Sequence, residues 1–265
     1  MEELPPELRL QILSILDLDR LSALVRTSSA FYREYRLSRR LILSKCLHVT
    51  LRSVTVDAYA VCQSSSDEFA STRTRDKVTQ FIYSYEDWRA PAYDSHFNEY
   101  LTENEAISMA TFHSSVIKPL VRCYVDWTLT NLSEETEGSP DHEPLSKTEE
   151  IRLLRALYRF QLCCNLFGAG RLRASRSFRL LSPRFQPVDI LKLFICLFEP
   201  WEVEEIACIY AFAREKYDLV FEDISWDVNE QNPKFEGHRP PTPDGAFDFD
   251  NSCRCRGSSF RSQVG

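Results

Sequence analysis

The stretch LPPELRLQILSILDLDRLSALVRTSSAFYREY, which runs from Leu4 to Tyr35, decides the fold of the N-terminal part of the chain. Pro5 and Pro6 suit the first turn of a helix, because the N–H groups that proline lacks would have no partner there. Apolar side chains then recur at the three- and four-residue spacing of a helix face, at Leu8, Ile12, Ile15 and Leu16. The stretch therefore begins with a predicted helix.

Two more short helices are predicted to follow. Asp17 and Asp19 interrupt the apolar run and can cap the helix after them. The second helix carries an apolar stripe made of Leu18, Leu21, Leu24 and Val25. Ser28 or Ser29 can cap a third helix, which carries Phe31, Tyr35, Leu41 and Ile42. The N-terminus is thus predicted to form three helices.

The leucines of these helices leave two interpretations open. A unit of about forty residues buries too little surface to hide all of them. Part of the apolar surface must then face either the rest of this chain or a partner protein. Periodicity alone favours the rest of the chain.

The order of the residues adds information that periodicity does not carry. The pattern L-P-x-E-L-x-x-x-I-L-x-x-L-D-L-x-x-L-x-x-L-V, followed by a small-residue turn and an aromatic, resembles the F-box over residues 3–47. The residues that carry it are Leu4, Pro5, Glu7, Leu8, Ile12, Leu13, Leu16, Asp17, Leu18, Leu21, Leu24 and Val25. Many F-boxes have Trp in the third helix, where this chain has Phe31-Tyr32.

The resemblance implies a non-catalytic adaptor. Such a protein docks on the Skp-type linker protein of an SCF (cullin–RING) ubiquitin ligase and presents a protein substrate, here unidentified, for ubiquitin-dependent degradation. Docking would be of the helix-in-groove kind. The residues implied to bind the linker protein are Leu4, Pro5, Leu8, Ile12, Leu13, Leu16, Leu18, Leu21, Leu24 and Val25. The segments at 152–160 and 199–202 also look like the divergent F-box proteins of filamentous fungi.

The composition limits the class of fold and of partner. The chain has 265 residues, of which 43% are hydrophobic, enough for one large domain or two small ones. Only 7 are glycine, which argues against a hairpin-rich β protein, so we expect a mainly α fold. The net charge of −7 makes nucleic acid an unlikely partner.

The cysteines and the N-terminus indicate the cytoplasm or the nucleus. Six of the 9 cysteines lie in apolar helical patterns, as buried reduced cysteines do: Cys46, Cys123, Cys163, Cys164, Cys196 and Cys208. The acidic N-terminus is unlike a signal peptide. The apolar run from Leu191 to Phe198 contains Lys192 and is too short to span a bilayer, so no membrane partner is expected.

Residues 48–226 are predicted to form a helical body. Capping boxes at Thr102 and Ser146 mark two helix starts, and Pro119 should kink the first of these helices near residues 116–118. An acidic linker is expected near 133–145. The helix at 150–167 is apolar nearly all round, so we expect it to be central, with Gly168 at its C′ position.

The remaining segments give weaker predictions. Pro187 and Pro200 open two helices that look like a buried hairpin. Residues 63–74 read as an exposed loop, and Arg171 to Arg184 as a basic loop. Residues 227–265 lack apolar periodicity and are predicted to be a disordered tail. Its end is either native or a gene-model artefact, and the sequence does not decide between them.

No motif for catalysis, cofactor binding or metal binding is found. The sequence contains no P-loop, G-x-G-x-x-G, G-x-S-x-G or H-E-x-x-H pattern. Cys253 and Cys255 with His238 lack a second ligand pair at zinc-finger spacing, and His113 reads as a surface residue. Three classes stay open: an F-box adaptor, an F-box protein outside a ubiquitin ligase, and a helical scaffold or regulator whose leucine-rich N-terminus is internal core.

Overall fold

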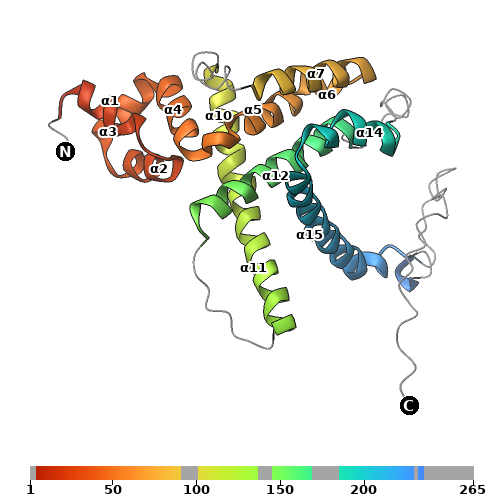
Figure 1. Cartoon of the computed structure of the whole chain (residues 1–265). Coiled ribbons are helices and arrows are strands. Elements are labelled where there is room, and N and C mark those ends of the chain that lie inside the picture. The colour runs from red at the N-terminus through yellow and green to blue at the C-terminus, as the bar shows by residue number, and fades with distance from the viewer. Residues whose placement is uncertain (1–3, 91–100, 137–144, 169–184, 230–231, 236–265) are drawn as a thin grey trace. The chain divides into compact units, whose positions relative to one another are not determined.

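The computed structural model describes residues 4–90, 101–136, 145–168, 185–229 and 232–235. Its contacts divide the chain into two units, residues 1–214 and residues 215–265, with the boundary inside one long helix. Every regular element in the described ranges is a helix, which confirms the mainly α fold (Figure 1). The first unit contains the predicted F-box region and most of the helical body.

Four helices, and not three, form the N-terminus. They are α1 (Pro6–Ser14), α2 (Leu18–Thr27), α3 (Ser29–Leu37) and α4 (Arg39–Leu51). Asp17 caps α2 as expected, because its carboxylate accepts the N–H of Arg20 at 2.8 Å. The predicted third helix is wrong as one element, since Ser38 has φ −123° and ψ 32° and separates α3 from α4. The F-box pattern alone gave no signal for this break.

The core of these four helices is apolar. Leu13, Phe31, Ile42 and Leu47 are fully buried, and Cys46 lies among them. The Cys46 thiol donates to the carbonyl of Leu13 at 3.1 Å, and burial raises the pKa of Cys46 to about 12. These contacts fix α1 against α4.

The body continues from α4 through η1 (Arg52–Val54), α5 (Thr55–Ser64), α6 (Asp67–Ser71) and α7 (Arg75–Trp88). The loop predicted at 63–74 is therefore partly helical: the Ser66 hydroxyl accepts the N–H of Phe69 at 3.2 Å and so caps α6. Later elements are α10 (Glu103–Phe112), the π-helical turn η2 (His113–Ile117), α11 (Lys118–Thr136) and α12 (Lys147–Phe167). Both predicted capping boxes, at Thr102 and Ser146, are present.

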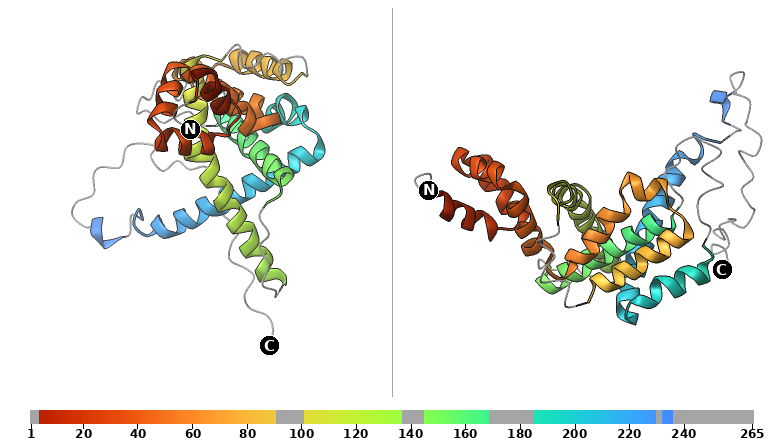
Figure 2. Two further views of the ribbon diagram at one scale, coloured as in Figure 1. Left: turned by 90° about the vertical axis from the view of Figure 1, so that its left-hand side faces the viewer. Right: turned by 90° about the horizontal axis from the view of Figure 1, so that it is seen from above.

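Helix α12 occupies the centre of the first unit, as its sequence predicted. It packs against α5, while α10 packs against both α4 and α5 (Figure 2). Its buried residues are Leu154, Ala156, Leu157, Tyr158, Arg159, Leu162 and Leu166. One of these is a charged arginine, which the pattern of apolar residues had not indicated.

Gly168 ends α12 for a reason other than the left-handed conformation that is common there. Its φ is −63°, but a Cβ at this position would lie 2.4 Å from the carbonyl oxygen of Cys164. Arg73 donates to the carbonyls of Asn165 and Gly168 at 2.6 and 2.7 Å. A cation therefore sits at the negative end of the helix dipole.

The helix irregularity predicted at Pro119 is present as the π-helical turn η2, directly before α11. This turn buries His113, against the prediction of a surface residue. The His113 Nδ1 lies 3.1 Å from the Tyr158 hydroxyl, and burial lowers the pKa of His113 to about 4. Helix α11 runs to Thr136, so it includes the first four residues of the linker predicted at 133–145.

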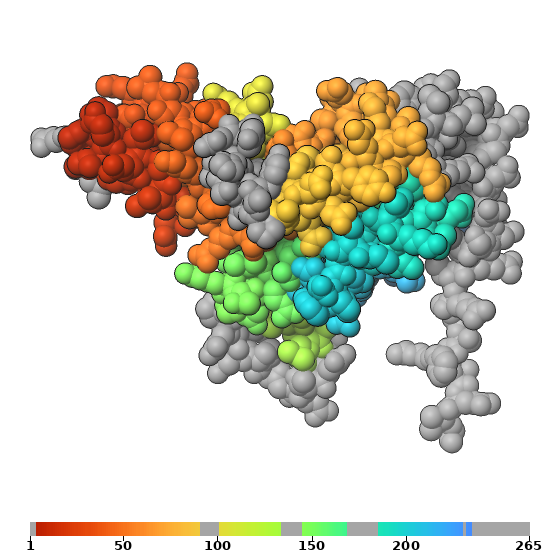
Figure 3. All heavy atoms as spheres, turned by 45° about the horizontal axis from the view of Figure 1, so that its top comes forward, coloured from red at the N-terminus to blue at the C-terminus, as the bar shows by residue number. Residues whose placement is uncertain are grey.

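The last helices that begin in the first unit are α14 (Pro187–Leu193) and α15 (Pro200–Ser225), with the 3-10 turn η3 (Ile195–Leu197) between them. The predicted hairpin is buried only in part. Helix α14 has no buried residue, whereas Phe194, Ile206 and Ile209 are buried. Figure 3 shows the surface of α7 alongside α14, where Arg75 Nη2 lies 3.0 Å from Asp189 Oδ1.

The second unit is described at the end of α15, at residues 226–229 and at the 3-10 turn η4 (Pro233–Phe235). Of the tail predicted at 227–265, residues 230–231 and 236–265, and with them Cys253 and Cys255, lie outside the described residues, as does the whole Arg171–Arg184 loop. Four cysteines expected to be buried are exposed: Cys123, Cys164, Cys196 and Cys208. No helix within the described ranges is long and apolar enough to cross a membrane.

Candidate functional site

An open groove lies between α1 and α4 and has a volume of about 500 Å³. Its lining combines apolar side chains of α1 with a few polar groups and one lysine of α4. The lining residues are Leu4, Leu8, Gln11, Ile12, Ser14, Ile15 and Lys45. We refer to it below as the α1 groove.

The α1 groove exists because α1 is apolar on more than one face. Leu13 turns into the core, where it is completely buried. Leu8, Ile12 and Ile15 follow each other at spacings of four and three residues, so they share a different face. Leu8 is 44% exposed and Ile15 72% exposed. A helix with apolar residues on two faces cannot bury both against one neighbour.

Contacts at both ends hold α1 in place. Arg9 Nη1 donates to the carbonyl of Leu4 at 2.9 Å, and Arg9 Nη2 lies 3.8 Å from Glu34 Oε2 on α3. Near the C-terminal end of α1, the carbonyl of Leu13 accepts the Cys46 thiol of α4 at 3.1 Å. The exposed leucine and isoleucine side chains are therefore presented by an anchored helix.

The apolar surface continues along α4. Leu41 and Val49 are 40% and 38% exposed, and they stand four residues before and after Lys45. Residues four apart lie on one helix face, so Leu41, Lys45 and Val49 form a row. Since Lys45 lines the α1 groove, Leu41 and Val49 lie one turn to either side of that point on α4.

The ten residues predicted to bind a linker protein divide into three groups. Leu13, Leu18 and Leu21 are buried, so they stabilise the helices and are not part of the exposed surface. Pro5 and Leu8 are exposed. The remaining five are partly buried against the core: Leu4, Ile12, Leu16, Leu24 and Val25. Of the ten, the α1 groove brings together Leu4, Leu8 and Ile12.

The sequence prediction omitted Ile15 and Lys45. Ile15 lies seven residues after Leu8 and three after Ile12, and that spacing could have placed it on the exposed face. Lys45 gave no local signal, because its position beside α1 depends on how α4 packs. Its cation is a polar group at the edge of an otherwise apolar surface.

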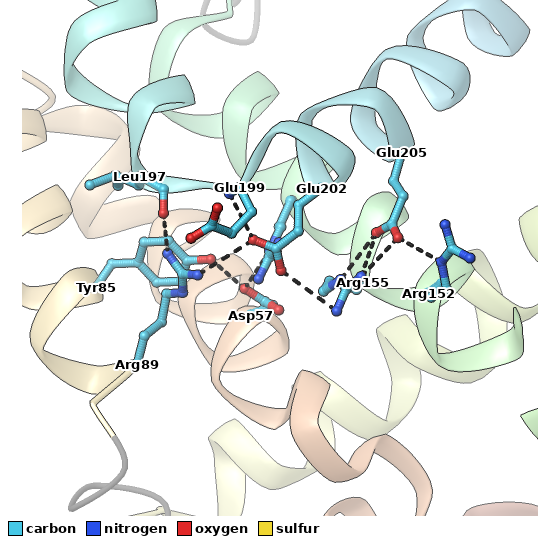
Figure 4. Close-up of polar contacts among 10 residues, drawn as sticks. Asp57, Tyr85, Arg89, Arg152, Arg155, Leu197, Glu199, Glu202 and Glu205 are labelled. Atoms are coloured by element: carbon cyan, nitrogen blue, oxygen red, sulfur yellow. Dashed lines mark hydrogen bonds and ion pairs between the residues drawn. The ribbon is translucent and has the colours of Figure 1, made fainter. Parts of the chain in front are cut away.

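A second cluster of polar and charged residues, which we call the Arg159 cluster, includes Asp57, Tyr85 and Glu202 (Figure 4). Arg159 is 4% exposed; its Nε lies 3.3 Å from Asp57 Oδ1 on α5, and its Nη1 lies 2.9 Å from Glu202 Oε1 on α15. The Tyr85 hydroxyl on α7 donates to Asp57. The guanidinium carbon of Arg159 also lies 4.4 Å from the centre of the Phe198 ring.

Further charges extend the Arg159 cluster along α12 and α15. Arg155 donates to both carboxylate oxygens of Glu205 at 2.8 Å, and Arg152 Nε donates to the same carboxylate at 2.8 Å (Figure 4). Arg89 donates to the carbonyl of Leu197 at 3.0 Å, and its other Nη lies 3.9 Å from Glu202. Four helices contribute to the cluster: α5, α7, α12 and α15.

The electrostatics of the Arg159 cluster favour a structural role. Burial would raise the pKa of Glu202, but the hydrogen bond and the charge of Arg159 together lower it below the ordinary value. Burial, followed by the charge of Asp57, raises the pKa of Tyr85. Glu202 thus stays ionised, and the carboxylate oxygens of Asp57 and Glu202 contact groups of the same chain. Carboxylates that are paired in this way stabilise the packing of the helices that carry them.

Within the described ranges, no group of three or more His, Cys, Asp or Glu residues could hold a metal ion. Comparison with known proteins gives no match: no family model fits the chain, and no curated protein or solved structure is significantly similar to it. The features of the chain that bear on function are therefore the sequence pattern of residues 3–47 and the α1 groove.

Proposed function

We propose that this chain is an F-box-like adaptor that docks on a Skp-type linker protein through the α1 groove and the adjoining row on α4. Through the linker protein it would join a cullin-based ubiquitin ligase and present a protein substrate. The adaptor itself would be non-catalytic, would need no cofactor, and would act in the cytoplasm or the nucleus.

One observation carries this proposal: α1 exposes Leu8 and Ile15 while it is anchored to α3 and α4. A contiguous exposed apolar surface on a soluble protein usually marks a partner site. The same residues belong to, or lie beside, the pattern that resembles the F-box. A partner helix that lays its apolar side chains into the α1 groove would cover Leu8 and Ile15.

The residues divide naturally into supports and contacts. Leu13, Leu18 and Leu21 hold the helices, and so preorganise the surface. Leu4, Leu8, Ile12 and Ile15 would contact the partner, and Lys45 would meet a carboxylate or a carbonyl at the edge. This assignment keeps three α1-side residues of the predicted docking surface, Leu4, Leu8 and Ile12, as partner contacts and adds Ile15 and Lys45 to them.

The decisive experiment is a calorimetric titration of the full chain with a Skp-type linker protein. We expect the wild type to bind. Replacement of an anchor at the centre of an interface costs roughly 2 kcal/mol or more. Leu8→Glu and Ile15→Glu should therefore each weaken binding by at least about tenfold, at about 1.4 kcal/mol per tenfold. Leu4→Ala with Pro5→Ala should have a smaller effect in the same direction.

A matched control is available on α14. Val188 is 52% exposed and is also aliphatic, so Val188→Glu makes the same chemical change away from α1. It should bind like the wild type, and thermal melts should show that all variants are folded. Equal binding by Ile15→Glu and Val188→Glu would reject the α1 groove as the docking surface.

A helical scaffold or regulator is the second candidate. The burial of Leu13, Leu18 and Leu21 favours it, because much of the leucine pattern is internal core. The packing of α4 against α10 also joins the N-terminal helices to the body. If the folded wild type shows no affinity for the linker protein, this candidate replaces the adaptor. Linker binding without recruitment of cullin would instead indicate an F-box protein outside a ubiquitin ligase.

A further inference from the structure

The C-terminal part of α15 carries an exposed apolar stripe that is separate from the α1 groove. Tyr217, Val220, Phe221 and Ile224 recur at spacings of three, one and three residues, which place them on one face of the helix. Their exposed fractions are 77%, 57%, 65% and 45%. We refer to these four residues as the α15 stripe.

The opposite face of this part of α15 is acidic. Glu215, Asp218 and Glu222 lie on it, at spacings of three and four residues. The helix is therefore amphipathic over its last turns, although both faces are exposed. An amphipathic helix is stable when its apolar face packs against another surface.

We propose that the α15 stripe binds the same stripe of a second copy of this chain, with the two helices antiparallel. Tyr210, Ala213, Tyr217, Val220 and Ile224 follow the seven-residue repeat of a coiled coil, with successive steps of three, four, three and four residues. In an antiparallel pair Tyr217 of one copy lies against Val220 of the other, and Ala213 lies against Ile224. Each layer combines a large residue with a smaller one.

Charge complementarity fixes the direction of the pair. Lys216 and Asp223 are seven residues apart and flank the α15 stripe on the same side. An antiparallel arrangement centred between Asp218 and Leu219 brings Lys216 of each copy beside Asp223 of the other. A parallel arrangement makes no such ion pair. Lys216 also has an interaction within its own chain, so the apolar face drives association and the charges only orient it.

The size of the α15 stripe indicates a weak dimer. An aromatic side chain buries roughly 150–250 Å² when it is covered. Two aromatic and two aliphatic residues from each copy then bury an area near the lower limit of about 1,200 Å² for stable interfaces. The sequence after residue 235 has Pro240, Pro241 and Pro243 and no second stripe with helical spacing, which favours another copy of α15 as the occupant.

Sedimentation equilibrium of the full chain tests this proposal. The average mass should rise with concentration from that of a monomer to that of a dimer. Val220→Glu should weaken dimerisation by at least about tenfold, because the charge would be buried in the pair. The matched control is Leu219→Glu, which alters an exposed residue, 48% exposed, on the other side of the same helix turn. It should dimerise like the wild type.

Charge exchange tests the direction. Lys216→Asp alone should weaken the dimer, and Lys216→Asp combined with Asp223→Lys should restore it. A wild type that stays monomeric at every concentration would overturn the proposal, and so would assemblies larger than a dimer. Equal weakening by Val220→Glu and Leu219→Glu would also overturn it. Failure of the charge exchange to restore dimerisation would reject the antiparallel arrangement.

Discussion

The helices α1–α4 and the helices around Arg159 are held together by different interactions. The first group packs through apolar side chains such as Leu13, Phe31 and Ile42. The second group adds a buried cluster in which Arg159 joins Asp57 and Glu202. Apolar packing is non-directional, so apolar side chains that the core does not cover can pack against a partner protein. Hydrogen-bonded ion pairs require a particular partner in a particular geometry. The charged side chains of the Arg159 cluster therefore select which helices pack against each other.

The largest expected effect is the loss of Arg159. Arg159→Leu leaves Asp57 and Glu202 buried without their main cation, so the free energy of unfolding should fall by about 3–5 kcal/mol. Chemical denaturation monitored by circular dichroism measures this change. Arg152→Ala on the same helix is the control, since that side chain is exposed and should alter stability little. A mild effect of Arg159→Leu would show that apolar packing alone holds the helices around Arg159, as it does in α1–α4.

The next largest effect distinguishes the core residue Leu13 from the proposed partner contact Ile15 by the stability that each variant loses. Leu13→Ala should lower the free energy of unfolding by about 2–5 kcal/mol, because it empties a fully buried position. Ile15→Ala, two residues later and mostly exposed, should change stability by less than about 0.5 kcal/mol. The same denaturation experiment compares them. If both variants lose equal stability, Ile15 belongs to the core, and the α1 groove is not a free surface.

The smallest expected effect is the change in stability with pH that His113 causes. His113 is buried in its neutral form, unlike the charged side chains of the Arg159 cluster. The pKa of His113 is lowered to about 4 from its ordinary value of 6.5. As the pH falls from 6.5 towards 4, the unfolded chain gains a proton at this position and the folded chain does not. Stability is therefore full above pH 6.5 and is lost below it, by about 2–3 kcal/mol near pH 4.

His113→Gln isolates this contribution from that of the carboxylates, which titrate in part of the same range. Asp19 and Lys118 act on His113 with opposite signs, after burial as the main cause, and Tyr158 contacts its ring. The free energy of unfolding of the variant should depend less on pH between 6.5 and 4 than that of the wild type. Identical pH dependence of the two proteins would show that folding does not shift the pKa of His113.

The sequence predicted correctly those structural features that depend on residues close together in the chain. The capping boxes at Thr102 and Ser146 were found because their two partners stand three residues apart. The central place of α12 followed from its apolar residues on all sides. The mainly α fold followed from the same periodicity and from the scarcity of glycine.

The sequence failed where distant residues meet. Asp57 and Arg159 are 102 residues apart, and Tyr85 and Asp57 are 28 apart, so no short pattern could join them. Ser38 separates α3 from α4 without a side-chain cap, which leaves no signature to read. His113 became buried because a π-helical turn directs it to Tyr158.

The sequence by itself determined that the chain is helical, where several of its helices begin, and that its N-terminus resembles an F-box. Only the tertiary structure decided which leucines are core and which are surface. Leu13 and Ile15 are both apolar, one in the last turn of α1 and the other at its C-cap, yet the first is fully buried and the second is 72% exposed. The physical reason is that periodicity defines the faces of a helix, whereas the packing of neighbouring helices determines which of those faces is covered.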